Sequence, residues 1–501
     1  MDQFDYVVVG AGSAGCVIAA RLSEDPQNRV LLLEAGAADG PEIMAVPPEW
    51  PRLIGSEVDW GYTTVPQPAA GGIARRYPRG KVLGGSSSIN AMAFIRGHRT
   101  NYDEWAAAAT GWGYEDLLPF FKRTETAQGR DPAYRGTDGP MRVAPARNAH
   151  ALSYAFLDAA EGAGYHRSDD LNGSDQEGVC WWDLNIVNGI RQSAADGYLR
   201  PALGRANLTV VTNALVHRLV VSDGRCAAVE YSVNGEGRRA YPHSETILSA
   251  GSIGSAHLLL LSGIGPADQL HAVGVDVVAD LTGVGTILYD HPLAGVTYTA
   301  AQPVPPGRNN HSEIVAAVRT TPDLAAPDLH LFLADVPHHP PSMPGPANGY
   351  TIVFSLLRPH SRGSVRLASA DPATSPLIDP NFFGDDRDMA LMLRALGMAR
   401  EVGNSPAFDE WRGEEVLPGS EVRDESELRD YLCGVFDTYH HPVGTCRMGT
   451  DPGAVVDPQL RVHGVDGLRV ADASVMPTLP GANPNATVLA IAERAAALVG
   501  R

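Results

Sequence analysis

The chain has 501 residues, of which 44% are hydrophobic and 19% charged, a composition typical of globular proteins and a length too great for one ordinary core. Its 39 lysines and arginines stand against 58 aspartates and glutamates, so the formal net charge is −19 at pH 7. This balance argues against partners that are nucleic acids or anionic membranes, and no run approaches the roughly 20 apolar residues of a membrane span.

The first 36 residues are typical of a βαβ unit that binds a dinucleotide. A strand over 6–9 runs into Gly10-Ala11-Gly12-Ser13-Ala14-Gly15, and a second strand over 29–33 ends on Glu34. Gly10 suits the tight turn, Gly12 lets backbone approach a pyrophosphate, and Gly15 lets helix pack on strand. The helix N-terminus attracts phosphates, and Glu34 can accept hydrogen bonds from a ribose. The predicted contacts in this unit are Gly10, Gly12, Ser13, Ala14, Gly15, Glu34 and Ala35.

The next 225 or so residues mix irregular segments with recognisable elements. Residues 37–79 are rich in proline and glycine, two short helices are predicted over 101–109 and 114–123, and 143–201 lack clear periodicity. Further on, the pattern predicts strands over 208–211, 219–221 and 228–231, and a core strand near 246–251 that feeds an apolar helix over 256–261.

From about residue 297 to 416 proline clusters separate strand-like runs such as 350–357, which predicts a second domain built on an antiparallel sheet. A strand at 470–472 and a helix after Gly481 indicate a return to the first domain. The predicted fold is α/β (α+β overall), with a Rossmann-like cofactor domain and an antiparallel-sheet substrate domain. Its segments are 1–145, 201–296 and 461–501 for the cofactor domain, and 146–200 and 297–460 for the substrate domain.

Four longer motifs follow one another in a fixed order. They are 78–90 (PRGKVLGGSSSIN), 250–266 (AGSIGSAHLLLLSGIGP), 439–449 (YHHPVGTCRMG), and Asp472-Ala473-Ser474 with 481–488 (GANPNATV). In this order the chain resembles the glucose–methanol–choline (GMC) flavoprotein oxidoreductases, in particular the choline dehydrogenase and hydroxymethylfurfural oxidase branch. The resemblance covers essentially the whole chain and implies that FAD takes a hydride, at flavin N5, from the carbon of an alcohol.

The resemblance also implies which other residues lie near FAD. The segment 84–88 lacks side-chain bulk, which suits close backbone approach to the cofactor, although alone it is equally compatible with a flexible linker. Some relatives bind flavin covalently through a histidine at the position of Ile89, so non-covalent FAD is expected here. Val216 is either a backbone contact to adenine or a strand core residue. The cofactor contacts implied beyond the first unit are Gly84, Ser88, Asn90, Val216, Ala250, Asp472, Ala473 and Asn485.

Two residues are the candidates for catalysis. Histidine suits removal of a hydroxyl proton near neutral pH, and His441 precedes Pro442, which favours an extended backbone. His440 is the competitor, and in an extended chain the two rings point to opposite sides, so only one should face the flavin. Asn483 either orients the alcohol oxygen beside His441 or caps the helix that Pro484 opens, and Asn485 can take either task.

The expected function is therefore oxidation of an alcohol to an aldehyde, with oxygen or another acceptor reoxidising the flavin. A primary alcohol is favoured, and aromatic and furanic alcohols are candidates among others. Trp181, Trp182, Phe332 and Phe436 are candidate pocket aromatics or core residues. Alternatives are an FAD-containing hydroxynitrile lyase without net redox chemistry and a NAD-linked reductase. Five scattered cysteines without a CxxC pair, and no leader before the first strand, suggest a cytoplasmic protein; no metal site is predicted.

Overall fold

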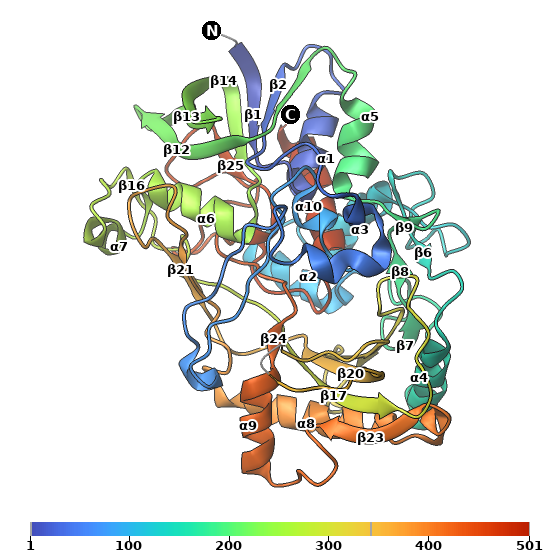
Figure 1. Ribbon diagram of the computed structural model, residues 1–501. Helices are drawn as coiled ribbons and strands as arrows, with labels where there is room; N and C mark the ends of the chain where they lie inside the picture. The colour runs from blue at the N-terminus through green and yellow to red at the C-terminus, as the bar shows by residue number, and fades with distance from the viewer. Residues whose placement is uncertain (1–2, 341–342, 500–501) are drawn as a thin grey trace.

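The computed structural model describes residues 3–340 and 343–499, and two seven-stranded sheets organise them (Figure 1). In the first sheet, neighbouring strands far apart in sequence pair in parallel, while a long hairpin extends one side in antiparallel pairing. Its path is β11 (Leu208–Val211), β2 (Val30–Leu33), β1 (Gln3–Val9), β14 (Glu236–Leu248), β13 (Arg225–Val233) and β12 (Ala214–Ser222), with β25 (Leu468–Val470) also pairing β14.

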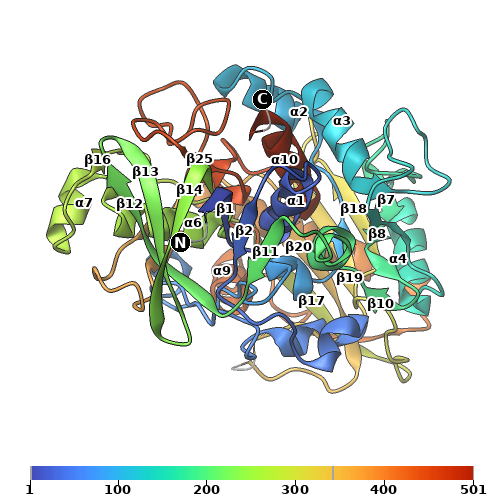
Figure 2. The ribbon, with the colours of Figure 1, turned by 90° about the horizontal axis from the view of Figure 1, so that it is seen from above.

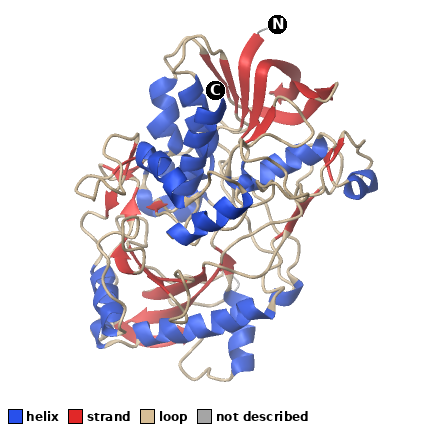
Figure 3. Ribbon diagram, turned by 180° about the vertical axis from the view of Figure 1, so that it is seen from behind, coloured by secondary structure: helices blue, strands red, loops and turns tan. Residues whose placement is uncertain are grey.

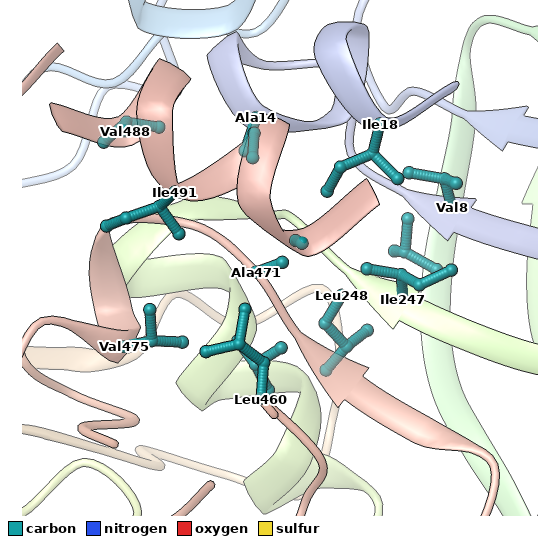
Figure 4. Packing of buried hydrophobic residues seen from close by; sticks show 14 of the residues in the cluster. Val8, Ala14, Ile18, Ile247, Leu248, Leu460, Ala471, Val475, Val488 and Ile491 are labelled. Carbon is teal, nitrogen blue, oxygen red and sulfur yellow. The ribbon is translucent and has the colours of Figure 1, made fainter. Parts of the chain in front are cut away.

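The parallel part of this sheet is covered by helices from both ends of the chain. All four residues of β2 are buried, as expected for a parallel strand packed on both faces. Helix α1 (Ser13–Leu22) and the C-terminal helix α10 (Asn485–Val499) pack together there, and Ala14, Ile18, Val488 and Ile491 belong to the same core (Figure 4). The late segment is thereby brought against the glycine-rich turn; α1 and α10 also lie side by side when seen from above (Figure 2).

The second sheet is antiparallel throughout and lies at the opposite end of the molecule (Figure 1). Its path is β23 (Arg412–Leu417), β17 (Pro292–Ala300), β20 (Gly349–Leu356), β19 (Leu329–Ala334), β18 (Ile314–Val318) and β7 (Gly178–Trp181), with β24 (Asp437–Thr438) also pairing β17.

Alternate residues of these strands belong to two different cores, as the two-residue period of a strand requires. On β19, Leu331 and Leu333 join a core with helices α4 (Ala151–Gly162), α8 (Asp386–Gly403) and α9 (Glu425–Val435). These helices cover the outer face of the sheet (Figure 3). Phe332 on β19 and Val353 on β20 point the other way, into a smaller core that faces the middle of the molecule.

The remaining α-helices are α2 (Arg99–Ala108), α3 (Tyr114–Thr124), α5 (Arg200–Ala202), α7 (Ala267–Ala272), and α6 (Gly251–Leu261), which lies beside the long hairpin. Small strand pairs are β3 (Ala93–Phe94) and β6 (Ala144–Pro145) on β8 (Asp183–Leu184), β4 (Glu125–Thr126) on β5 (Met141–Arg142), β9 (Ile186–Val187) on β10 (Ile190–Arg191), β15 (Ile264–Gly265) on β16 (Ala279–Asp280), and β21 (Ser364–Arg366) on β22 (Leu377–Asp379).

The predicted fold class agrees with this architecture. The strand expected near 246–251 is the end of β14, which is 13 residues long because its first half pairs with β13 in the hairpin. Helix α4 lies in a segment for which no element was expected. The five predicted domain segments remain a prediction, and β17 crosses the predicted boundary at 296/297.

Candidate active site

A cavity of about 840 Å³ lies between the two sheets, which is within the range of ligand sites (roughly 300–1,000 Å³). Most of the residues predicted to touch a cofactor line it, although they come from segments hundreds of residues apart. They are Gly10, Gly12, Ser13, Ala14, Glu34, Ala35, Asn90, Val216, Ala250, Asp472, Ala473 and Asn485, together with His441 and Asn483. The topology therefore collects one site from the whole chain.

Three helices begin at the wall of this cavity: α1 after Gly12, α6 after Ala250, and α10 at Asn485. Gly12 provides no side-chain cap, so backbone N–H groups remain at the start of α1, whereas the first N–H of α6, that of Gly251, donates to Asp472 Oδ2 at 2.9 Å. Ser13 Oγ donates to Asn485 Oδ1 at 2.7 Å and ties two of the helix ends together, while Asn485 Nδ2 is buried without a partner. Such ends carry partial positive charge and suit the phosphates of a dinucleotide.

Glu34 holds the glycine-rich turn. Its two carboxylate oxygens accept the backbone N–H groups of Ala11 and Gly36, both at 2.8 Å. Burial raises the pKa of Glu34 to about 7, against the opposing effect of these hydrogen bonds. The carboxylate thus shapes the turn as well as lining the cavity, and its further lone pairs remain for a ribose.

Gly15, Gly84 and Ser88 do not line the cavity but support the residues that do. A Cβ on Gly15 would lie 1.8 Å from Gly10 O, so this glycine permits the close contact between helix and strand. Gly84, at φ +89°, donates its N–H to Ala11 O, and Ser88 Oγ donates to Leu83 O. These bonds give the 84–88 segment a defined 3₁₀ conformation over Gly85–Ser88, so it is not a flexible linker.

Asp472 and Val216 each combine a structural contact with a place in the wall. Asp472 accepts hydrogen bonds from Gly251 N, Ser255 Oγ and Ser474 N, and so fixes the start of α6. Burial raises the pKa of its carboxyl, and those bonds oppose the rise. Val216, on β12, belongs to the main core, which agrees with the strand-core interpretation, and it also lines the cavity; its contact with adenine stays a prediction.

His441 is fixed by its backbone and by its ring. Its N–H donates to Asp290 Oδ1 at 2.8 Å, and the same carboxylate accepts Tyr77 OH and Thr438 Oγ1 at 2.6 and 2.5 Å. Burial lowers the pKa of His441 well below 6.5, with neighbouring His291, His440 and Arg79 acting in the same direction. The ring is therefore neutral near neutral pH and able to accept a proton.

The neighbouring ring of His291 decides which nitrogen of His441 is free. His291 Nε2 lies 3.0 Å from Leu357 O, and a carbonyl only accepts, so Nε2 carries the hydrogen. Burial lowers the pKa of His291 to about 3, so the ring is neutral and its Nδ1 is an acceptor. His441 Nδ1, at 2.9 Å from that atom, must then be the donor. Its Nε2 keeps a lone pair and has no partner among the described residues.

The prediction that His440 and His441 lie in an extended chain, with only one facing the site, is wrong. His440 has φ +65°, a left-handed conformation, and its N–H donates to Thr438 Oγ1 at 2.8 Å. This turn brings both histidines to the cavity wall. The two still differ, because only His441 has a ring partner that assigns its tautomer; His440 Nδ1 is buried without a partner.

Asn483 does not cap the following helix. Helix α10 begins at Asn485, and the carbonyl of Pro484 accepts Val488 N at 2.8 Å. The Oδ1 atom of Asn483 is buried without a hydrogen-bond partner, and the residue lines the cavity. Oδ1 is therefore available to a ligand, while the side chain also has a hydrogen bond with Tyr439; the catalytic interpretation of Asn483 stays a prediction.

An aromatic wall continues from His441. Tyr439 lies 4.3 Å from the His441 ring, centroid to centroid, and stacks on Phe332 at 5.4 Å. Trp182 and Phe332 line the cavity as proposed for pocket aromatics, together with the aliphatic Leu293 and Val353, whereas Trp181 and Phe436 lie elsewhere.

Sequence reasoning did not single out His291, Asp290 or Tyr439. His291 could have been found from the sequence, because His291-Pro292 repeats the His-Pro dipeptide of His441-Pro442. Tyr439 lay within a quoted motif but had no distinguishing feature of its own.

Comparison with known proteins identifies the family. Family models described as GMC oxidoreductase match residues 4–293 and 359–492. The chain belongs to the GMC oxidoreductase family. It is 39% identical to mitochondrial choline dehydrogenase of Homo sapiens, covering 99% of this chain and 90% of the relative. Oxygen-dependent choline dehydrogenase of Rhizobium etli is 38% identical (99% and 95% covered). The crystal structure of pyridoxine 4-oxidase from Mesorbium loti superposes with a TM-score of 0.96 at 38% identity, covering 99% of each chain.

The chain is thus an FAD-dependent alcohol oxidoreductase of the GMC family, and the site fits that cofactor. The glycine-rich turn and the uncapped start of α1 suit the pyrophosphate, and Asn485 Nδ2 is a buried, unpartnered polar atom of a residue that lines the cavity. None of the described helices is both long and apolar enough to cross a bilayer.

Proposed function

We propose that this enzyme oxidises a primary alcohol to an aldehyde, with His441 as the base and Asn483 orienting the alcohol oxygen. FAD, when bound, supplies the hydride acceptor. The observation that carries the proposal is which ring nitrogen of each histidine carries the hydrogen. His441 Nδ1–H donates to His291, so His441 Nε2 has a free lone pair in the cavity wall. A neutral, oriented imidazole can take the hydroxyl proton as the α-hydrogen leaves.

The wall around this atom supports a flat, largely uncharged substrate. Phe332, Tyr439 and Trp182 offer aromatic faces, and Leu293 and Val353 offer aliphatic contact. We propose an aromatic or furanic alcohol as the preferred class, since stacking on such rings is favourable. The acceptor that reoxidises the flavin is oxygen or another carrier. The five cysteines form no disulfide, which supports our proposal of a cytoplasmic location.

The test is anaerobic reduction of the purified, FAD-loaded enzyme by a panel of alcohols. Aryl and furanic primary alcohols should bleach the flavin absorbance without added nicotinamide, and faster than choline or aliphatic alcohols of similar size. A yellow protein that no alcohol bleaches would contradict the redox function and favour lyase chemistry. Reoxidation of the bleached enzyme with oxygen, against an artificial acceptor, then assigns the electron acceptor.

A further inference from the structure

Arg79 places a positive charge in the cavity wall, and the carboxylates of Asp59 and Asp290 act on it through space without forming an ion pair with its guanidinium. No aspartate or glutamate oxygen in the described part of the chain forms a salt bridge with its guanidinium. Burial lowers the pKa of Arg79, which is the expected effect on a cation withdrawn from water. Two fully buried arginines differ from it in this respect, because Arg96 and Arg135 both bind Glu125, at 2.6 and 2.7 Å.

The side chain is held in place by neutral groups. Arg79 Nη2 donates to His440 O at 2.6 Å, and Nε donates to Pro78 O. Its own N–H donates to Asp59 Oδ1 at 2.9 Å, which fixes the backbone. Nη1 makes no hydrogen bond with the described residues and is not sealed from the cavity. An oriented guanidinium with a free terminal nitrogen is a site for an anionic oxygen.

Arg79 lies toward the end of the cavity where the histidines are. It binds the carbonyl of the residue that precedes His441, and its charge contributes to lowering the pKa values of both His440 and His441. Glu34 lies toward the other end of the cavity, and the nearby charge that lowers the pKa of its carboxyl is Lys81, not Arg79. Arg79 and Lys81, which stand on either side of Gly80, therefore act on groups at different ends of the cavity.

We propose that Arg79 is the counter-charge for the flavin ring of the bound FAD. Uptake of two electrons and one proton leaves the ring with one additional negative charge, and a fixed cation in a low-dielectric site favours that state. Arg79 therefore raises the reduction potential of the flavin. The inference depends on the cofactor and not on which alcohol is oxidised.

The experiment compares FAD-loaded wild type with R79Q, R79K and R75Q. Two quantities are measured without any alcohol: the two-electron midpoint potential, by equilibration with a reference dye, and the Kd for sulfite, which adds to oxidised flavin as an anion. Arg75 is the matched control, because it is another arginine without an ion pair, but its guanidinium lies over Phe436 at 4.3 Å and outside the cavity.

R79Q should lower the equilibrium constant for reduction about tenfold, which is a potential about 30 mV more negative for a two-electron couple. Sulfite binding should weaken by a similar factor. R79K keeps the charge but loses the second terminal nitrogen of the guanidinium, so the equilibrium constant for reduction and the affinity for sulfite should each fall about two- to threefold. R75Q should match wild type in both measurements.

Three results would overturn the proposal. Potential and sulfite Kd within twofold of wild type in R79Q would leave Arg79 a purely structural role. Weaker FAD binding with an unchanged potential would assign the cation to the phosphates. Unchanged flavin properties with a raised KM for carboxylate-bearing alcohols would assign it to the substrate. If R79Q does not retain FAD, the R79K variant is the test. A sulfite Kd of R79K equal to that of R75Q would contradict the proposal.

Discussion

His291 and His441 meet through their Nδ1 atoms at 2.9 Å, and one carboxylate oxygen, Asp290 Oδ1, accepts the backbone N–H groups of both residues at 2.8 Å. The two rings are therefore fixed relative to one another by main chain as well as by side chain. Since His291 Nε2 is committed to Leu357 O, the pair has one consistent arrangement of hydrogens when both rings are neutral. It leaves the lone pair of His441 on Nε2.

Replacing His291 with phenylalanine should slow anaerobic flavin reduction by roughly 10- to 100-fold, as loss of an orienting partner of a functional histidine does elsewhere. The change removes the acceptor of the His441 Nδ1–H, so the ring loses both its orientation and its assigned tautomer. Stopped-flow absorbance measures the rate. FAD content should be unchanged, because His291 is fully buried behind His441 and does not line the cavity.

His330 provides the matched control. It is also a fully buried histidine, and its ring packs edge-on against Trp182 at 5.5 Å, but neither ring nitrogen has a hydrogen-bond partner. H330F should reduce its flavin within about twofold of the wild-type rate. Equal losses in H291F and H330F would mean that burial of an imidazole, and not the contact with His441, is what matters.

Replacing His441 with alanine should have the largest effect, a loss of roughly 10²–10⁴ in the rate of flavin reduction if it acts as a general base. H440A should cost less, since the His440 ring lacks a partner that assigns its tautomer. The assignment fails if H440A abolishes reduction while H441A leaves it near normal. If neither variant is impaired, alcohol oxidation itself is in question and lyase chemistry gains support.

Much of this site was predictable because its parts have local signatures. The glycine-rich turn and Glu34 were located from their spacing, and the segment after Asp472 from the family resemblance; all of these segments meet at one cavity. The topology of a parallel sheet makes this possible, since strand ends from distant parts of the chain share one edge. Helix α8 was not anticipated, although Asp385 caps it and Met389, Met392 and Leu396 recur at helical spacing; the surrounding prolines and strands obscured it.

Other features had no local signature. The positive φ of His440 arises from Thr438 Oγ1, which accepts the His440 N–H, and from Asp290, 151 residues before His441, which accepts the next N–H. The tautomer of His441 depends, through His291, on the carbonyl of Leu357, the residue that follows strand β20. Neighbour-by-neighbour reasoning predicted an extended dipeptide because it could not include these long-range partners.

FAD should be released when the protein is denatured. Ile89, at the position where some family members attach flavin, lines the cavity and packs with Leu53, Val58 and Val82, and it offers no nucleophile. Acid precipitation followed by centrifugation should leave the flavin in the supernatant, in about equimolar amount to the protein. Flavin that remains with the pellet after washing in denaturant would show a covalent link through another residue.

Two fully buried neutral histidines should make the enzyme sensitive to acid. Burial lowers the pKa values of His291 and His330 from 6.5 to about 3 in the folded chain. Below about pH 6.5 the unfolded chain therefore binds more protons than the folded one, and the free energy of unfolding falls as pH falls. Each group contributes a slope of about 1.4 kcal/mol per pH unit, which continues until the folded pKa is reached.

H330F isolates this contribution, because phenylalanine keeps an aromatic ring at the position and removes one titrating group that makes no hydrogen bond with His441. Urea unfolding of wild type and H330F, at a fixed excess of FAD, should be followed between about pH 6 and 4. The wild type should lose about 1.4 kcal/mol per pH unit more than the variant, so the stability difference between the two should shift toward H330F as the solution is acidified. Parallel stability curves would mean that His330 takes up its proton inside the folded protein, and the hydrophobic contact with Trp182 would then have to tolerate an imidazolium.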